Sequence, residues 1–376
     1  MKILLQRRGF VRHPKRARSL LGAGFGVRPS RPFATLMVAT LFTSCQEVAS
    51  PGDATLWSAP QEPGRREVLT PEWRESWSVG GQADALLASP RHLTSLDTLV
   101  VWWDDYDHAL LAVGGEDGVL RWRFGREGQG PGEFLDVGDV AVDAAGTLIV
   151  LDSDLGRITR LGPTGAVVRQ IRLPEGYWRS VAPLPDGSFV LAGVDAARPF
   201  VQVDPKGRVL DRFGAPWAGF AGLSLIQRQG SVISAPDGRW AYAFLIGNGW
   251  LPFRGISPVD PPGQAIEHTS FPELIVVGSR RERITKLVSR PSCSTCSGWL
   301  RGDTLQVLFG GDSEHAHRVV DRYLWTGGRY LSSLRLPVEA VEAVGVAGRM
   351  VLLERALEPR LVAYAPVSTP SASPPP

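Results

Sequence analysis

The feature that most constrains this 376-residue chain is a repeated pattern of short apolar strands separated by glycine turns. Between Gly138 and Ile171 the apolar residues are spaced for four short strands, and Ala144-Ala145-Gly146 and Pro163-Thr164-Gly165 supply turn chemistry between them. The stretch from Ser180 to Phe213 repeats this plan with other residues. Two consecutive copies indicate an array of small sheets instead of isolated hairpins.

Further copies can be found from the second strand of each unit, because Asp or Gly precedes it every time. The copies stand at intervals of roughly 40 to 65 residues, a spacing that suits propeller blades with inserted loops. The six markers are Thr98–Val101, Thr147–Val150, Ser188–Leu191, Arg239–Tyr242, Thr304–Val307 and Arg349–Leu352. The sequence therefore predicts an all-β, six-bladed β-propeller of four-stranded antiparallel blades over residues 71–366.

The last unit lacks an outer strand, since the chain turns at Pro366 into a Pro- and Ser-rich tail, 367–376, that we expect to be disordered. The segment Trp73–Val79 precedes the first unit and is placed to supply the missing strand. Such closure removes an exposed sheet edge. The best local candidate for a helix is Ser279–Leu287, which we interpret as an insertion between blades four and five.

Residues 1–44 contain nine Lys and Arg and no acidic residue, and they end in the apolar segment Phe33–Ser44. This segment has the length of a secretory signal and is too short to span a membrane as a helix. We therefore predict a signal peptide over 1–44. It is longer than usual, which a true start downstream of Met1 explains most simply; the alternative is a twin-arginine export signal at Arg7-Arg8. Taking these nine from the 41 basic residues leaves 32 against 38 acidic ones, a net charge of −6, which argues against nucleic acid as a partner.

Thr43-Ser44-Cys45 resembles the lipobox of bacterial lipoproteins, with Phe42 where that pattern usually has Leu. The resemblance implies that Cys45 is acylated and holds the protein on a membrane, most simply the outer membrane because Gln46 follows, facing the periplasm or the surface. Residues 45–70 would then form a flexible tether. The alternatives are an ordinary secreted protein and a buried thiol.

The segment Phe124–Phe134, followed by Val140–Asp143, resembles an NHL repeat and, more widely, the six-bladed propeller superfamily. The resemblance covers about Phe124–Leu161. The residues that carry it, which we interpret as structural, are Gly125, Gly128, Gly130, Pro131, Gly132, Phe134, Asp152 and Arg157. Glycine permits positive φ where the chain passes between blades, and Asp152 and Arg157 are expected to pair across a turn.

Cys293 and Cys296 stand three positions apart in a predicted loop. In an exported protein such a pair favours a small structural disulfide. A redox pair, a zinc site completed by His315 and His317, and free thiols remain as alternatives.

Trp178, Trp217 and Trp250 lie near predicted loops, where indole rings can form a platform for a sugar or a protein partner, and core packing is the alternative. The acidic run Asp104–His108 is interpreted as a charged surface turn, with calcium binding as its alternative. Neither pattern identifies a ligand.

The innermost strands are expected to begin near the following residues: His92, Asp139, Ser180, Val232, Ser297 and Val341. These do not form an obvious ring of metal ligands, and no Gly-x-Ser-x-Gly motif is present. We therefore expect a monomeric binding or scaffold module for a protein, peptide or glycan, without cofactor or metal. The alternative is the kind of enzyme that the superfamily resemblance implies, a lyase or lactone hydrolase with a divalent ion in the channel.

Overall fold

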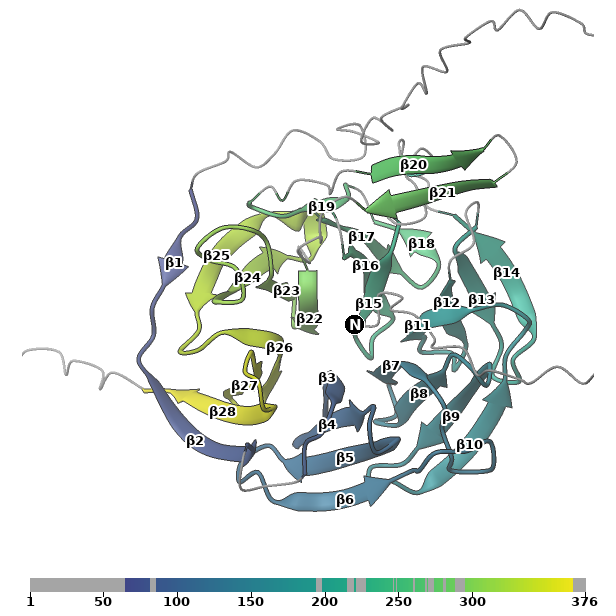
Figure 1. Ribbon diagram of the computed structural model, residues 1–376, viewed down its shortest axis with the longest axis horizontal. Helices are drawn as coiled ribbons and strands as arrows, with labels where there is room; N and C mark the ends of the chain where they lie inside the picture. Colours follow the sequence, from purple (N-terminus) through teal and green to yellow (C-terminus); the bar gives the residue numbers. More distant parts are fainter. Residues whose placement is uncertain are drawn as a thin grey trace, which may run out of the picture. The chain divides into compact units, whose positions relative to one another are not determined.

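The computed structural model describes residues 65–81, 86–193, 198–214, 220, 228–245, 247, 249–259, 261–267, 269, 274–279, 282–287 and 295–367. Six antiparallel sheets follow one another in a ring, as Figure 1 shows. Each sheet has its first strand at the centre and its fourth at the rim. The predicted all-β, six-bladed propeller is confirmed.

Blades one to four take their four strands in sequence order. Blade one consists of β3 (Pro90–Leu96), β4 (Leu99–Asp104), β5 (Ala109–Gly114) and β6 (Leu120–Phe124), and blade two of β7 (Val137–Val142), β8 (Leu148–Asp152), β9 (Arg157–Leu161) and β10 (Val167–Arg172). Blade three consists of β11 (Trp178–Pro183), β12 (Phe189–Gly193), β13 (Phe200–Val203) and β14 (Val209–Phe213). Blade four consists of β15 (Gly230–Ser234), β16 (Arg239–Phe244), β17 (Gly249–Arg254) and β18 (Ser257–Pro258), with β19 (Gly263–Gln264) also paired to β17.

Blades five and six each recruit a strand from the N-terminal side of the ring. Blade five consists of β22 (Thr295–Arg301), β23 (Thr304–Phe309), β24 (Val319–Leu324) and β25 (Tyr330–Arg335), with the 3₁₀ turn η2 (Thr326–Gly328) before β25. Blade six consists of β26 (Ala340–Val346), β27 (Arg349–Glu354), β28 (Arg360–Pro366) and, as its outer strand, β2 (Trp73–Gly80). The predicted closure of the last blade is thereby confirmed.

Two segments differ from the expectations. The helix expected at Ser279–Leu287 is wrong: the chain forms a β-hairpin of β20 (Leu274–Ser279) and β21 (Glu282–Leu287) between blades four and five. The end of the predicted tether is part of the ring, because β1 (Val68–Leu69) pairs in parallel with β25 outside blade five. The predicted signal peptide, residues 45–64 and residues 368–376 lie outside the described residues.

The core is divided into six hydrophobic clusters, one between each pair of neighbouring blades. Between blades three and four, Trp240 stacks on Phe253 with ring centroids 4.1 Å apart, and Phe200 meets both rings edge to face. Both faces of a middle strand are therefore buried, which explains why strands such as β8 and β16 read as continuous apolar runs.

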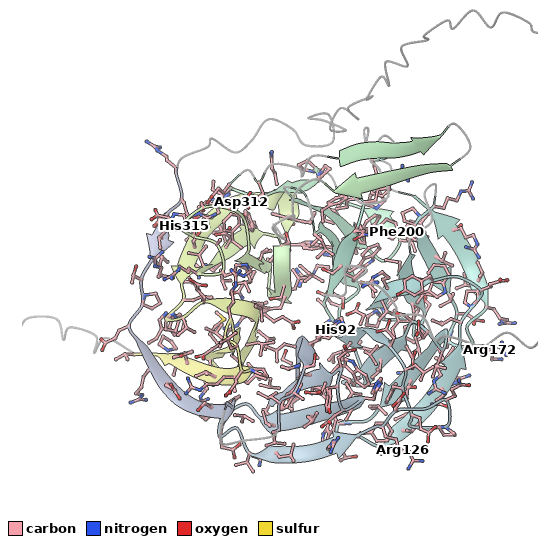
Figure 2. The ribbon with its side chains drawn as sticks, in the orientation of Figure 1. His92, Arg126, Arg172, Phe200, Asp312 and His315 are labelled. Atoms are coloured by element: carbon pink, nitrogen blue, oxygen red, sulfur yellow. The ribbon has the colours of Figure 1, made fainter. Side chains whose placement is uncertain are left out.

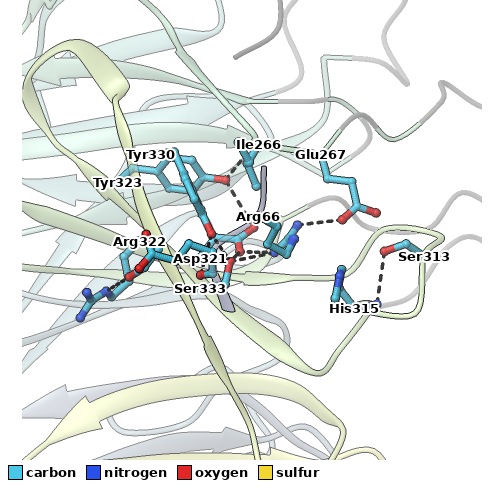
Figure 3. A network of polar contacts seen from close by, with 12 residues as sticks. Arg66, Ile266, Glu267, Ser313, His315, Asp321, Arg322, Tyr323, Tyr330 and Ser333 are labelled. Carbon is cyan, nitrogen blue, oxygen red and sulfur yellow. Dashed lines mark hydrogen bonds and ion pairs between the residues drawn. The ribbon is translucent and has the colours of Figure 1, made fainter. Parts of the chain in front are cut away.

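A buried ion pair fixes the N-terminal segment to blade five (Figure 3). Arg66, which precedes β1, pairs with Asp321 of β24 and with Glu267 at 2.9 Å, and its guanidinium also donates to the Ser333 hydroxyl. The side chains of Arg66 and Asp321 are only 8% and 2% exposed. Burial raises the pKa of Asp321 to about 6, against the opposing effects of Arg66 and Ser333.

We predict that Arg66→Met lowers the free energy of unfolding by about 3 to 5 kcal/mol near pH 8, because it leaves the Asp321 carboxylate buried without its cation. The loss should shrink toward pH 5, where the variant's Asp321 can take up a proton. Urea denaturation at both pH values measures it. Arg65→Met, which changes an exposed neighbour, is the control; an equal effect of the two substitutions would contradict the prediction.

Candidate functional site

The first strands β3, β7, β15, β22 and β26 line a central channel with a cavity of about 580 Å³. Polar side chains surround it near the points where these strands begin. They include His92, Asp139, Ser231, Ser297 and Glu342. His92 lies beside the centre of the ring in Figure 2.

A β-bulge decides which side chain of an inner strand reaches this level. Register shifts immediately precede Asp139 in β7, Ser180 in β11, Ser297 in β22 and Glu342 in β26. The extra residue of a bulge bends the strand and re-aims the side chain beside it. The bulge in β26 therefore presents Glu342, where the sequence led us to expect Val341.

Two of these side chains join blade six to its neighbours. Glu342 accepts hydrogen bonds from the backbone N–H groups of His92, at 3.2 Å, and Leu93, at 2.7 Å, in blade one. On the other side, the Ser297 hydroxyl of blade five accepts the N–H of Ala343 at 2.9 Å. Both side chains satisfy backbone groups that face the channel, so they stabilise the contacts between blades.

Asp139 makes the corresponding contact between blades two and three, where its carboxylate accepts the Val181 N–H at 2.9 Å. The imidazole of His92, in blade one, hydrogen-bonds to the Val137 carbonyl in blade two. The backbone of His92 is strained, with φ at 55°. Inter-blade hydrogen bonds thus engage the polar groups on which channel chemistry would depend.

Burial changes the protonation of these groups. It raises the pKa of Asp139 to about 7, with a smaller contribution from the charge of Glu342, although the N–H groups of Val181 and Val140 act in the opposite direction. Burial also raises the pKa of Glu342 and lowers that of His92 to about 4. The channel therefore favours the neutral form of each group.

The NHL-like segment forms the crossing from blade one to blade two. Gly125, Gly128 and Gly132 have φ values of 106°, 148° and 75°, which side chains rarely adopt. The Gly130 N–H donates to the Glu133 carboxylate at 2.7 Å, and the fully buried Phe134 packs edge to face against Trp103. Pro131, within the same turn, is exposed.

The expected pair of Asp152 and Arg157 does not form. The buried Asp152 carboxylate accepts backbone N–H groups, from Leu135 and Leu155, both at 3.0 Å. Arg157 donates to carbonyl groups of the crossing segment, such as Gln129 at 3.0 Å. Both side chains hold the crossing segment against blade two through these bonds to its backbone.

Asp104, at the end of β4, repeats the arrangement of Asp152 in blade one. It is fully buried and accepts the N–H groups of Ala88 and Ser89, at 2.8 and 3.0 Å, as well as those of Tyr106 and Asp107. The acidic run was expected at the surface. Its first carboxylate instead fastens the entry to the blade.

Of the three tryptophans predicted to lie near ligand-binding loops, two are described, and both are buried. Trp178 and Trp250 are 4% and 1% exposed, so both rings lie in the core and not on exposed loops. Trp250 packs against Tyr323, with ring centroids 4.6 Å apart. Trp217 and Cys293 lie outside the described residues, as does Cys45, and of Cys296 only the position in β22 is described.

A second cavity, of about 380 Å³, lies between blades five and six; we name it the 5/6 cleft. It opens at the turn face, by which we mean the side of the ring that carries the turns between first and second strands. Its lining combines indole rings, guanidinium groups and an amide: Trp73, Trp299, Arg301, Gln306, Arg322 and Arg349. Trp299 and Arg301 also line the channel, so the two cavities adjoin.

The described residues contain neither a cluster of metal ligands nor a membrane-spanning helix. Within that part of the chain, no three or more His, Cys, Asp and Glu side chains gather closely enough to hold a metal ion. His317, which the sequence offered as a zinc ligand, directs Nδ1 at the Ala340 carbonyl at 2.9 Å. No helix in the same ranges is long and apolar enough to cross a membrane.

Comparison with known proteins finds the fold and no sequence relative: no protein family and no curated protein matches the chain. A candidate exported protein of Bacteroides fragilis has a TM-score of 0.53 and 11% identity, with 80% of this chain and 99% of that one covered. The structure of U3-55K has a TM-score of 0.50 and 11% identity, with 79% of this chain and 100% of that one covered. Virginiamycin B lyase from Staphylococcus aureus has a TM-score of 0.48 at 10% identity, with 79% and 100% covered. At these identities the likeness shows the propeller fold alone.

We predict that Asp139 makes folding less favourable as pH rises from about 4 to about 7. Over this range the folded state keeps a proton that the unfolded chain releases, so stability from this group is lost with rising pH. The free energy of unfolding of the wild type, minus that of Asp139→Asn, should fall by at most about 4 kcal/mol, and by less where channel water screens the charge. Urea denaturation across this range measures the difference.

His92 acts with the opposite sign, since its lowered pKa makes stability rise with pH between about 4 and 6.5. Only the difference between wild type and variant therefore isolates Asp139. The exposed Asp154→Asn is the matched control. A difference curve for Asp139→Asn that stays as flat as the control would contradict the assignment.

Proposed function

We propose that this chain is a binding or scaffold module of the cell envelope, tethered through an acylated Cys45, which presents the turn face of its propeller to a protein, peptide or glycan. The observation that carries the proposal is the 5/6 cleft. Its indole and guanidinium groups lie in an open concave surface, a setting typical of binding sites. The NHL-like crossing segment supports an interaction role in addition.

The hydrogen bonds in the channel also favour a binding module. Glu342, Asp139 and Ser297 each hydrogen-bond to the backbone of a neighbouring blade. If one of these side chains took part in a reaction, the backbone N–H group that it accepts from would lose its acceptor. These inter-blade hydrogen bonds account for the polar lining of the channel without requiring that it catalyse a reaction.

An enzyme is the second candidate, and one observation favours it. Asp139 and Glu342 have raised pKa values within one channel, where their charges interact, and shifted carboxyl groups in a concave site are typical of acid and base catalysts. A lyase or lactone hydrolase with a divalent ion would place that ion here. Metal analysis of the purified protein separates the candidates: stoichiometric metal, lost in both Asp139→Asn and Glu342→Gln, would favour the enzyme.

The proposed turn-face contact can be tested by photo-crosslinking. A photoreactive residue at Arg329, exposed on the turn face near blade five, should crosslink a partner in envelope preparations. The same residue at Leu357, fully exposed on the opposite face with 105% relative accessibility, is the matched control. Equal crosslinking from the two positions, or crosslinking from Leu357 alone, would contradict the proposed face.

Membrane attachment is tested with the full chain expressed in a bacterium that acylates lipoproteins. We predict that the wild type incorporates labelled palmitate and sediments with membranes, whereas Cys45→Ser does neither, because the thiol is the acylation site. Cys293→Ser is the control and should behave like the wild type. Membrane association that survives Cys45→Ser would show that another segment holds the protein.

A further inference from the structure

We infer that the 5/6 cleft binds a carboxylate-bearing peptide segment, with Arg301 and Arg322 facing the carboxylate. The inference deepens the proposed function and rests on it. It names the chemistry of the partner at that surface.

The cleft is cationic. Among the described residues its lining includes Arg301, Arg322 and Arg349 and no acidic residue. None of the three forms an ion pair with a described residue, whereas Arg318 and Arg360 in the same two blades pair with Glu339 and with Glu75 and Glu354. Arginine guanidinium groups bind carboxylates through two parallel hydrogen bonds, which makes an anionic ligand the natural occupant.

Strand alternation explains why these side chains meet in the cleft. On β23, Leu305 and Val307 pack toward blade four, so the residue between them, Gln306, faces blade six. On β24, Tyr323 also packs toward blade four, and its neighbour Arg322 faces blade six. The polar side chains occupy positions that apolar residues fill deeper in the same interface.

Gln306 gives a second, independent sign of a ligand. It is only 8% exposed, lines the cleft, and its amide has no hydrogen-bond partner among the described residues. The Gln306 amide atoms are not enclosed by protein, so they keep access to the cleft, where a ligand can donate to the oxygen and accept from the nitrogen. The Trp299 indole N–H in the same lining is buried without a partner among the described residues, which is costly unless a partner molecule or water meets it.

The remaining lining selects a peptide over a sugar. Leu334, Met350 and Pro366 give the cleft an apolar wall, which fits an aliphatic side chain beside the carboxylate. Sugar hydroxyl groups need acceptors as well as donors, and the described residues of the lining supply no carboxylate to accept from them. A peptide with an acidic residue next to an apolar one would contact both the arginines and the apolar wall of the cleft.

Arg322 is held in position before any ligand arrives. Its Nε–H donates to the Ser332 hydroxyl at 3.0 Å, which leaves the two terminal nitrogen atoms for a carboxylate. A guanidinium fixed in this way loses less conformational freedom on binding. Gly345 contributes space, since a Cβ there would lie 3.0 Å from the Trp299 indole nitrogen.

Calorimetric titration of the full chain with acetyl-Leu-Glu-Leu-amide tests the inference, with acetyl-Leu-Gln-Leu-amide as the matched neutral probe. We expect saturable binding of the acidic peptide and a dissociation constant at least about tenfold higher for the neutral one. Arg301→Gln and Arg322→Gln should each raise the constant for the acidic peptide at least about tenfold. Arg74→Gln, an exposed arginine on β2 outside the cleft, should leave it unchanged.

We expect the Gln306→Glu variant to fold, because the substitution changes the charge of the side chain and keeps its size similar. The new carboxylate would pair with the cleft arginines, so the variant should lose peptide binding without a lower melting temperature. Equal binding of the two peptides, unchanged binding by Arg301→Gln and Arg322→Gln, or tighter binding of glucuronate than of the acidic peptide would overturn the inference. Crosslinking from Arg329 without peptide binding would overturn it and leave the proposed binding role intact.

Discussion

Pairing of β2 with β28 is the interaction on which the ring depends, because it joins the two ends of the propeller within one sheet. The register runs from Trp73 opposite Pro366 to Gly80 opposite Arg360. Without β2, blade six would expose the edge of β28 and the apolar cluster beneath it would lose Trp77 and Val79. The parallel pairing of β1 and the Arg66 ion pair extend the same N-terminal segment to blade five. Two neighbouring blades are therefore bound to one continuous stretch of chain.

The closed ring also explains the polar channel. Six sheets that converge on one axis bring the N–H groups of their inner strands together, and those groups need acceptors. Bulges at Asp139 and Glu342 supply carboxylates for this purpose, and a carboxylate surrounded by protein acquires a raised pKa. A shifted pKa in this channel is accordingly what inter-blade hydrogen bonding produces by itself. It is weaker support for catalysis here than it would be in a site whose acids had no structural partner.

Sequence periodicity predicted the blades because glycine turns and alternating apolar runs are local signals. The missing outer strand of the last unit also predicted the role of Trp73–Val79, since a ring cannot close without it. β1 could not be predicted, because two residues carry no periodic pattern. The β20–β21 hairpin was mistaken for a helix, since Ile284 and Leu287 stand three positions apart as they would on one helical face.

The candidate site was less accessible to sequence reasoning, for geometric reasons. A bulge moves the channel position by one residue, which separates Glu342 from the expected Val341. Trp178 and Trp250 stand near strand ends, where sequence alone does not tell a loop from the first buried position of a strand. The 5/6 cleft arises because Gln306 and Arg322, on adjacent strands, both face blade six. That coincidence depends on the register between β23 and β24 and on the small Gly345 opposite.

Cation pairing elsewhere on blades five and six shows that arginines near acids in this fold do pair. The cleft arginines, which form no ion pair with a described residue, are thus explained better by a ligand that brings its own carboxylate than by the requirements of the propeller.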